Sequence, residues 1–184
     1  MTELTTDRLL MRQWRESDRE PFAAMNADPA VMEHFPALMT REQTDAFIDR
    51  ISPAIDERGW GLWALEVRDT GRFIGFTGLS VPSFEAHFTP AVEIGWRLAK
   101  EAWGNGYATE AARAALAHGF GPAGLEEIVS FTATTNLPSQ RVMQRIDMTH
   151  DEADDFDHTR LPDGHRLQRH VLYRINRAQW EATR

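Results

Sequence analysis

The spacing of apolar residues changes along the chain, and each spacing predicts a different secondary structure. In segment 40–59 the large apolar side chains recur every three or four residues and share one face of a helix, at Phe47, Ile48, Ile51 and Ile55. Thr40 and Gln43 form a Thr-x-x-Gln capping box, which predicts where this helix starts. Gly59 predicts its end, and Pro53 predicts a bend within it.

Other helices are predicted before and after this one. Segment 15–35 is expected to form one or two short helices, the first capped by Ser17 or Asp18 and the next by Asp28 before a proline. A long alanine-rich segment begins after Gly106 and is expected to remain helical to about residue 120. A further helix is expected over 136–146, with its N-cap at the first of these positions.

Alternating or uninterrupted apolar runs predict the strands. They are expected near residues 9–14, on both sides of the Asp69-Thr70-Gly71 turn, and over 91–99, 126–134 and 167–175. Hairpin-connected strands come first, and a strand–helix–strand–helix–strand tail follows. This order predicts a mixed α+β fold, in one domain that spans residues 1–184.

Composition narrows the function without choosing it. The 184 residues include no cysteine, which excludes disulfides, thiol nucleophiles and cysteine-bound zinc. The net charge of −8 argues against a nucleic-acid partner and mildly favours a cationic substrate such as an amine. The chain has no apolar run long enough for a membrane span and no secretory signal pattern at its start, so we expect a cytoplasmic protein without a membrane partner.

Two glycines stand where the long helix must begin. Gly104 and Gly106 flank Asn105, directly after the strand predicted over 91–99. Glycine costs about 1 kcal/mol relative to alanine in a helix, so another advantage must select it. The first amides of a helix lack intrahelical partners and attract anions, and glycine lets a diphosphate approach them closely. The pattern therefore predicts a diphosphate-binding turn.

Other interpretations of this turn remain open on the turn alone. A Walker loop requires Gly-Lys-Ser/Thr, which is absent. The dinucleotide fingerprint requires a third glycine where Thr109 stands, within a strand–helix–strand repeat, whereas hairpins precede this segment. The remaining alternative is a tight strand-to-helix turn that binds no ligand.

Three separated segments resemble motifs of the GCN5-related N-acetyltransferase superfamily, in its RimJ/RimL-like branch. They are LTTDRLLMRQWRESD, VEIGWRLAKEAWGNGYATEAARAAL and TNLPSQRVMQRIDM, and in order they cover about Leu4 to Met148. They are similar to the branch's Thr-x-Arg-Leu-x-Leu-Arg opening, its Gln/Arg-x-x-Gly-x-Gly/Ala acetyl-CoA motif and its Asn-x-x-Ser-x-x-Val-x-x-Lys-Leu-Gly-Phe helix. The resemblance implies a mixed, mostly antiparallel, twisted sheet that is flanked by helices and splayed at the acetyl-CoA site.

The chain departs from these motifs at three places. Glu101 stands where glutamine or arginine is usual, which removes a cation near the phosphates. Arg145 replaces lysine and keeps the charge, while Asp147-Met148 replaces glycine and phenylalanine. Aspartate adopts a left-handed backbone more readily than most residues, so the helix is still expected to end there.

The resemblance implies acetyl-CoA as the acyl donor, without a metal, and it assigns the contacts. Backbone amides would hold the diphosphate along Trp103, Gly104, Asn105, Gly106, Tyr107, Ala108 and Thr109. Asn136 would contact the pantetheine arm while it caps its helix, and Ser139 would reach the sulfur and assist the departing thiolate. Arg145 is a further coenzyme-binding candidate. The tetrahedral oxyanion would be stabilised by the backbone amide of Arg97 or Leu98 on a distorted strand.

Glu93 is the candidate base for the amine. A lysine-like amine costs about 4 to 5 kcal/mol to deprotonate at pH 7, and an α-amine about 1 to 1.5 kcal/mol, so the base need not be strong. In the resemblance Glu93 aligns with a strand glutamate that acts as base, through water, in some relatives. The alternative is a surface or cross-strand charge.

The segment from His150 to His170 is rich in Asp and His but fits neither the calcium-loop template nor a His-Glu-x-x-His zinc helix. A polar loop is the favoured interpretation. A second hypothesis places residues of this segment in the acceptor pocket, at Asp155, Asp157 or His158. Aromatic side chains that would wall the same pocket are Phe35, Trp60 and Trp63, unless they belong to the core.

The resemblance implies an acetyl-CoA-dependent N-acetyltransferase that transfers acetyl directly to a primary amine. By the branch resemblance the first candidate acceptor is a protein N-terminal α-amine, and small-molecule amines remain open. A non-catalytic acyl-CoA-binding sensor or interaction module on the same fold is the alternative, and a nucleotide enzyme is a third. The sequence leaves open whether the protein is a monomer or a homodimer.

Overall fold

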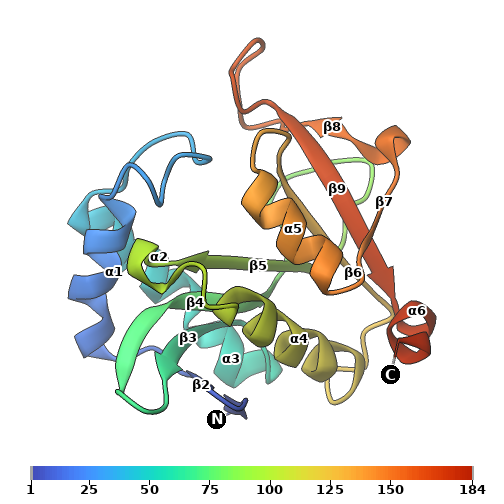
Figure 1. Ribbon diagram of the computed structural model, residues 1–184. Coiled ribbons are helices and arrows are strands. Elements are labelled where there is room, and N and C mark those ends of the chain that lie inside the picture. Colours follow the sequence, from blue (N-terminus) through green and yellow to red (C-terminus); the bar gives the residue numbers. More distant parts are fainter. Residues whose placement is uncertain (1, 184) are drawn as a thin grey trace.

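A twisted sheet with helices on both faces forms the body of the computed structural model, which describes residues 2–183 (Figure 1). The strands in this range follow the order β1-β2-β3-β4-β5-β6-β9-β7, and β8 pairs with β9 off that path. They are β1 (Leu4–Thr5), β2 (Leu9–Arg12), β3 (Leu62–Val67), β4 (Arg72–Ser80), β5 (Glu93–Leu98), β6 (Glu127–Ala133), β7 (Thr149–His150), β8 (Phe156–Asp157) and β9 (Arg169–Asn176). The helices are α1 (Arg19–Asn26), α2 (Arg41–Ile51), α3 (Pro53–Arg58), α4 (Tyr107–Phe120), α5 (Leu137–Arg145) and α6 (Arg177–Ala182), with short 3-10 turns η1 (Glu16–Asp18), η2 (Lys100–Ala102) and η3 (Glu152–Asp154).

The two central strands, β5 and β6, separate after a single paired position. They run parallel and align at Glu93 and Val129, where the Val129 amide also bonds to the Val92 carbonyl at 2.9 Å. All other neighbouring pairs in the described sheet are antiparallel. The sheet therefore divides into an arm of β1 to β5 and an arm of β6 to β9 (Figure 1). This geometry confirms the expected mixed, mostly antiparallel sheet that is splayed at its centre and flanked by helices.

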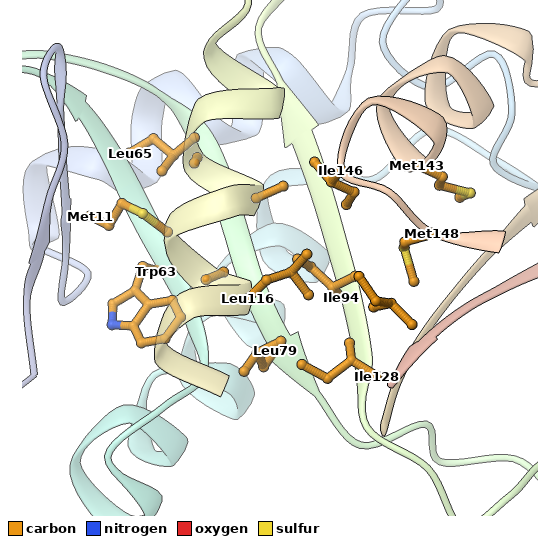
Figure 2. Close-up of a cluster of buried hydrophobic side chains, with 14 of the residues drawn as sticks. Met11, Trp63, Leu65, Leu79, Ile94, Leu116, Ile128, Met143, Ile146 and Met148 are labelled. Carbon is orange, nitrogen blue, oxygen red and sulfur yellow. The ribbon is translucent and has the colours of Figure 1, made fainter. Parts of the chain in front are cut away.

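The helices α4 and α5 cover one face of the sheet. Small residues and one leucine are fully buried along the middle of α4, at Ala111, Ala112, Ala115 and Leu116. Small side chains let the helix lie close to β4 and β5, where Leu116 lies next to Ile94 (Figure 2). The same cluster includes Met143 and Ile146 from the α5 segment. This core fixes the start of α4 beside the end of β5.

The helices α1 and α2 cover the opposite face with aromatic side chains. Phe22 of α1 packs on Trp14 with ring centroids 5.0 Å apart, and on Phe76 of β4 at 5.9 Å. Phe47 of α2 joins this cluster. A separate cluster lies on the second arm and contains Phe88, Val129, Phe156 and Leu172.

The residues that mark the starts and ends of helices gave the most accurate predictions from the sequence. The Thr40 side chain accepts a bond from the Gln43 amide and the Gln43 side chain reaches back, which confirms the capping box. Gly59 ends α3 in a left-handed conformation with φ of +77°. The proline divides the predicted helix more fully than expected, because α2 ends at Ile51 and Pro53 opens α3.

The connection from α1 to α2 differs from the expectation. No second helix follows Asp28, whose side chain instead accepts a bond from the Ala30 amide at 2.8 Å within a series of turns. Asp18 occupies the N-cap position of α1 without capping it. Its carboxylate pairs with the buried Arg12 guanidinium at 2.8 Å, which uses the oxygens that a cap would need.

The last helix, α6, was not predicted, although an Asn176-x-x-Gln179 capping box marks its start. A sequence search for capping boxes could have found it. Among residues 2–183, no helix is both long enough and apolar enough to cross a membrane.

Candidate active site

The glycine turn forms the link between β5 and α4 and is exposed. Gly104 and Gly106 have φ of +77° and +79°, a left-handed backbone that side chains with a Cβ rarely adopt. Asn105 closes the turn, since its side-chain amide donates to the carbonyls of Ala102 and Trp103, each at 3.1 Å. The glycines therefore serve the conformation of the turn as well as its accessibility.

The first amides of α4 are left open by this turn. Gly106 is the N-cap residue, so no side chain caps the helix, and its carbonyl is used by the Glu110 amide at 3.0 Å. Capping side chains normally satisfy the donors of the first helical turn. Open donors at the positive end of a helix fit a diphosphate group, and the residues present therefore suit the coenzyme's diphosphate.

Arg8, near the N-terminus, stabilises the glycine turn through contacts with Asn105, Glu110 and Tyr107. Its guanidinium donates to the Asn105 carbonyl at 2.9 Å, pairs with Glu110 at 2.6 Å and lies 4.7 Å from the centre of the Tyr107 ring. Thr6 adds a hydroxyl bond of 2.6 Å to Glu110. Burial opposes ionisation of Glu110, but the bonds from Thr6 and Arg8 outweigh it and lower the pKa of that carboxyl.

This contact was missed by the sequence analysis. Glu101 was expected to leave the phosphate site short of a cation. Arg8 supplies a cation at that place, and Glu101 pairs instead with Arg72 at 2.5 Å. The signal was present, because Arg8 is the arginine of the Thr-x-Arg-Leu motif.

Trp103 lies at the edge of the turn with 49% of its surface exposed. Its indole N–H donates to the Leu98 carbonyl at 2.9 Å, so the ring is tied to the end of β5. An exposed aromatic ring beside a phosphate-binding turn offers a flat surface to a ligand, in addition to the backbone contact predicted for this residue.

Backbone groups of β5 point alternately toward β4 and toward the opening between the two arms. The Ala99 amide bonds to β4 at 2.9 Å, whereas the Leu98 carbonyl accepts from Trp103 on the other side. By this alternation the Leu98 amide faces the opening and the Arg97 amide faces β4. Of the two candidates for the oxyanion donor, the Leu98 amide is therefore the one that points away from β4 and can reach a ligand. The register between β4 and β5 is continuous, so the strand distortion that was expected is absent from this pair.

The side chains of β5 also alternate between two faces. Ile94 and Leu98 belong to the core under α4, whereas Arg97 contacts the aromatic rings of the α1–α2 layer. Glu93, an even number of residues from Arg97, lies on that second face. Its Oε1 atom lies 3.7 Å from the position that a Cβ on Gly95 would occupy, so the carboxyl lies over the bare backbone there.

Burial changes the acidity of Glu93. Desolvation raises its pKa to about 8, against a smaller opposing effect from a hydrogen bond with Ser80. A carboxyl with such a pKa exchanges its proton close to neutral pH, which suits a general base. The side chain is half-buried by its exposed surface, and its catalytic role stays a prediction.

Asn136 and Ser139 lie at the start of α5, where β6 ends. The Asn136 side chain accepts from the Ser139 amide at 3.3 Å, which confirms the predicted cap. Its NH₂ group donates to the hydroxyls of Thr132 at 2.9 Å and Ser139 at 3.1 Å. The Ser139 oxygen therefore acts as an acceptor in this network, and its own proton is free for another partner.

Arg145 ends α5 and is exposed. Its carbonyl accepts a bond from Arg113 of α4, and Asp147 follows with φ of +66°, as expected for the helix end. These contacts join α5 to α4, and the Arg145 side chain remains a coenzyme-binding candidate by position alone.

The candidates on the acceptor side have different surroundings. Trp63 is fully buried and donates to the Thr2 carbonyl at 2.9 Å, which confirms the core alternative for this residue over the pocket wall. Trp60 packs against the same core. His158 lies 4.4 Å from the Phe84 ring, and its pKa is lowered by burial and by the nearby charge of Arg160.

The two aspartates of the same hypothesis are engaged in pairs. Asp155 pairs with His150 at 2.7 Å, and Asp157 lies 3.4 Å from Arg169. Within residues 2–183 no group of three or more potential metal-ligating side chains is present. The polar segment therefore contains ion pairs between its own side chains and the short strands β7 and β8.

The glycine turn, Glu93 and the Asn136–Ser139 pair lie on, or directly follow, the two strands that separate. The turn follows β5, Glu93 stands at the last paired position of β5 with β6, and Asn136 follows β6. The site thus combines donors for a diphosphate, a strand amide for an oxyanion, a carboxyl of raised pKa and a hydroxyl donor. This set of groups suits acyl transfer to an amine.

The comparisons with known proteins agree with this chemistry. The acetyltransferase (GNAT) domain family matches residues 8–149. The YkkB protein of Bacillus subtilis is 34% identical over 150 residues, covering 80% of this chain and 85% of that protein.

Two solved structures extend the comparison to the fold. A GNAT-family acetyltransferase from Bacillus anthracis has a TM-score of 0.79 and 26% identity, covering 96% of this chain and 99% of that one. The ribosomal-protein α-N-acetyltransferase RimL, in complex with coenzyme A, has a TM-score of 0.74 with coverage of 95% and 97%, but at 16% identity it shows the fold alone. With the family match extending over most of its length and its splayed sheet shared with a solved relative, the chain belongs to the GNAT family of acetyltransferases.

Proposed function

We propose that this enzyme transfers the acetyl group of acetyl-CoA directly to a primary amine, in a ternary complex. The observation that carries the proposal is the position of Glu93, a carboxyl of raised pKa, at the point where β5 and β6 separate and on the same strand that leads to the open glycine turn. The coenzyme supplies an activated thioester. The chain supplies positioning and proton transfer.

Each group in the opening has a distinct task in this proposal. The amides from Gly104 to Thr109 bind the diphosphate, and the Leu98 amide stabilises the negative charge that develops on the carbonyl oxygen. Glu93 takes the proton from the amine through water. Ser139, whose oxygen already accepts a bond from Asn136, donates a hydrogen bond from its hydroxyl to the departing thiolate and keeps its proton.

A protein N-terminal α-amine is the first candidate acceptor, within a RimJ/RimL-like branch. The opening motif around Arg8, which resembles that branch, supports this choice. An α-amine also needs less help from a base, about 1 to 1.5 kcal/mol at pH 7. Small-molecule amines are the other candidate acceptors.

The test is thiol release from acetyl-CoA with a library of N-terminal peptides and small amines. We expect acetylation of at least one amine, and a fall of about 10²- to 10⁴-fold in kcat for Glu93→Gln with the coenzyme Kd unchanged. Ser139→Ala is expected to lower kcat as well. Tight coenzyme binding with no amine acetylated would favour the acyl-CoA-binding sensor, and full activity in both variants would refute the catalytic assignments.

A further inference from the structure

Arg97 is a buried cation that lacks an acidic partner. Only 8% of its surface is exposed, and its Nε atom has no hydrogen-bond partner. Its Nη1 atom donates to the Asn26 side-chain oxygen at 2.7 Å and lies 3.7 Å from the Met39 sulfur. Across the described residues no carboxylate contacts this guanidinium, whereas most other arginines form ion pairs.

The surroundings of Arg97 keep it in place without neutralising it. Its guanidinium carbon lies 4.1 Å from the centre of the Phe35 ring, with Phe47 and Phe76 at 5.8 and 5.6 Å. Asn26 is itself held by a bond from its amide to Thr44 at 3.1 Å, which directs its oxygen at the arginine. Aromatic faces and one amide offset only part of the cost of burying a charge, so binding of an anion to this guanidinium would be favourable.

Arg97 and Glu93 share one face of β5, with Gly95 between them. Four residues of strand span about 13 Å between their Cα atoms, and the Glu93 carboxyl lies over Gly95, toward Arg97. Gly95 places no side chain on this face. The strand therefore presents a base, a bare stretch of backbone and a cation in one line.

The segment that covers Arg97 also extends to the second arm of the sheet. Phe35 belongs to the α1–α2 connection, whose neighbouring residue His34 lies 3.5 Å from the Thr135 hydroxyl. The Glu33 carbonyl accepts a bond from Arg166 at 3.0 Å. The connection thus bridges the two arms on the face that carries Glu93, where the acceptor amine must approach in the proposed reaction.

We propose that Arg97 binds a carboxylate of the acceptor, so that the preferred substrates are amines that carry a carboxylate within a few bonds of the reacting nitrogen. This inference rests on the proposed acetyl transfer and specifies its substrate class. The amine is placed near Glu93 and the carboxylate meets the unused Nε edge of the guanidinium, which can form two parallel bonds with a carboxylate. A free amino acid and the acidic first residue of a peptide both provide this chemistry.

The test compares each acid with its own amide. Glycine, β-alanine and 4-aminobutanoate are assayed against their carboxamides, and peptides that begin with Glu or Asp against peptides that begin with Gln or Asn. We expect at least one acid to exceed its amide by about 10- to 100-fold in kcat/KM, the range for a hydrogen bond to a charged group. A small-molecule preference and a peptide preference identify the two sources of the carboxylate.

The variants separate recognition from folding. Arg97→Gln is expected to bring the acid-to-amide ratio down toward one, Arg97→Lys to keep part of it, and the exposed Arg58→Gln to leave it unchanged. Comparing ratios between enzymes cancels differences in the reactivity of the amines. Circular dichroism and melting temperature report whether each variant folds. The ratio in the unmodified enzyme, corrected for the fraction of each amine that is neutral at the assay pH, tests the inference without any variant.

The outcomes are distinct from those of the proposed function. Amines acetylated with a ratio near one in the unmodified enzyme would refute carboxylate recognition and leave acetyl transfer standing. A high ratio that survives in Arg97→Gln would refute the role of Arg97. If no amine is acetylated, calorimetric titration of 4-aminobutanoate and its amide onto the coenzyme-loaded protein tests the carboxylate contact directly. Binding that is selective for the acid and that Arg97→Gln abolishes supports the contact. Equal binding of acid and amide, or no binding of either, refutes it.

Discussion

Arg8 and Glu110 lie 102 residues apart in the sequence and form a two-point ion pair at the start of α4, with Nε–Oε2 and Nη2–Oε2 distances of 2.7 and 2.6 Å. The same guanidinium holds the Asn105 carbonyl at 2.9 Å. The opening strand region is thereby joined to the turn that would receive the diphosphate. This contact links the first motif of the family to the second.

Arg8→Gln is expected to weaken acetyl-CoA binding about tenfold, because the turn loses a charge-assisted bond and the site loses its nearest cation. Isothermal titration of coenzyme A measures the change. Arg58→Gln removes an exposed arginine elsewhere and should leave the Kd as it is. An unaltered Kd in Arg8→Gln would show that the turn holds its shape without this pair.

Gly104→Ala and Gly71→Ala form a matched pair for the glycine turn. Both glycines have left-handed φ, +77° and +67°, and neither would bring a Cβ within 4 Å of another atom. Each substitution should therefore cost a similar ~1 kcal/mol of stability. We expect coenzyme affinity to fall only in Gly104→Ala. Equal affinities in the two variants would contradict a ligand-binding role for the turn.

The pH dependence of activity is expected to follow Glu93. Because burial raises its pKa to about 8, kcat/KM should rise with pH and level off above about pH 8. Two acceptors with amines of different pKa separate the contributions, since only the inflection common to both belongs to the enzyme. That common inflection should disappear in Glu93→Gln. Its persistence would assign the titration to another group.

The free energy of unfolding should also depend on pH through the Glu93 carboxyl. Below pH 4.5, the ordinary value, Glu93 is protonated in the folded and unfolded states alike. As pH rises toward 8, the unfolded chain loses this proton first, so the contribution to folding stability falls and then stays level. Denaturant unfolding of Glu93→Gln and the unmodified enzyme should show a gap that grows in favour of the variant between these two pH values. A constant gap would mean that the folded carboxyl titrates normally.

Asn136→Ala and Asn176→Ala compare two helix caps. Each side chain accepts a bond from the amide three residues later, so each loss should cost about 1 kcal/mol in chemical denaturation. Only Asn136 also holds the Ser139 hydroxyl, at 3.1 Å. We therefore expect turnover to fall in Asn136→Ala and to remain in Asn176→Ala. Normal turnover in both would limit Asn136 to a structural role.

Sequence reasoning was reliable where neighbouring residues determine the backbone. The Thr40 cap and the left-handed Gly59 follow from side chains and φ angles within a few positions, as does the positive φ of Asp147. Asp28 failed the same reasoning, because one Asp before a proline serves a turn as well as a helix.

Contacts between distant segments could not be predicted in this way. The pairing of Arg8 with Glu110 and the burial of Arg97 depend on how strands and helices pack together. The spacing of apolar residues within one segment carries no information about such contacts. Leu98 was favoured over Arg97 as the oxyanion donor only when the direction of its backbone bonds was known. For Trp63 the strand pattern did not decide which face of the sheet is buried. The packing of α4 places its side chain in the core.

The most direct test of the central claim observes the turn's amides themselves. In a ¹⁵N-glycine-labelled sample titrated with coenzyme A, the amide signals of Gly104 and Gly106 should shift, and pantetheine, which has no diphosphate, should leave them in place. Shifts elsewhere in the protein with these two signals unmoved would contradict a diphosphate held by the glycine turn.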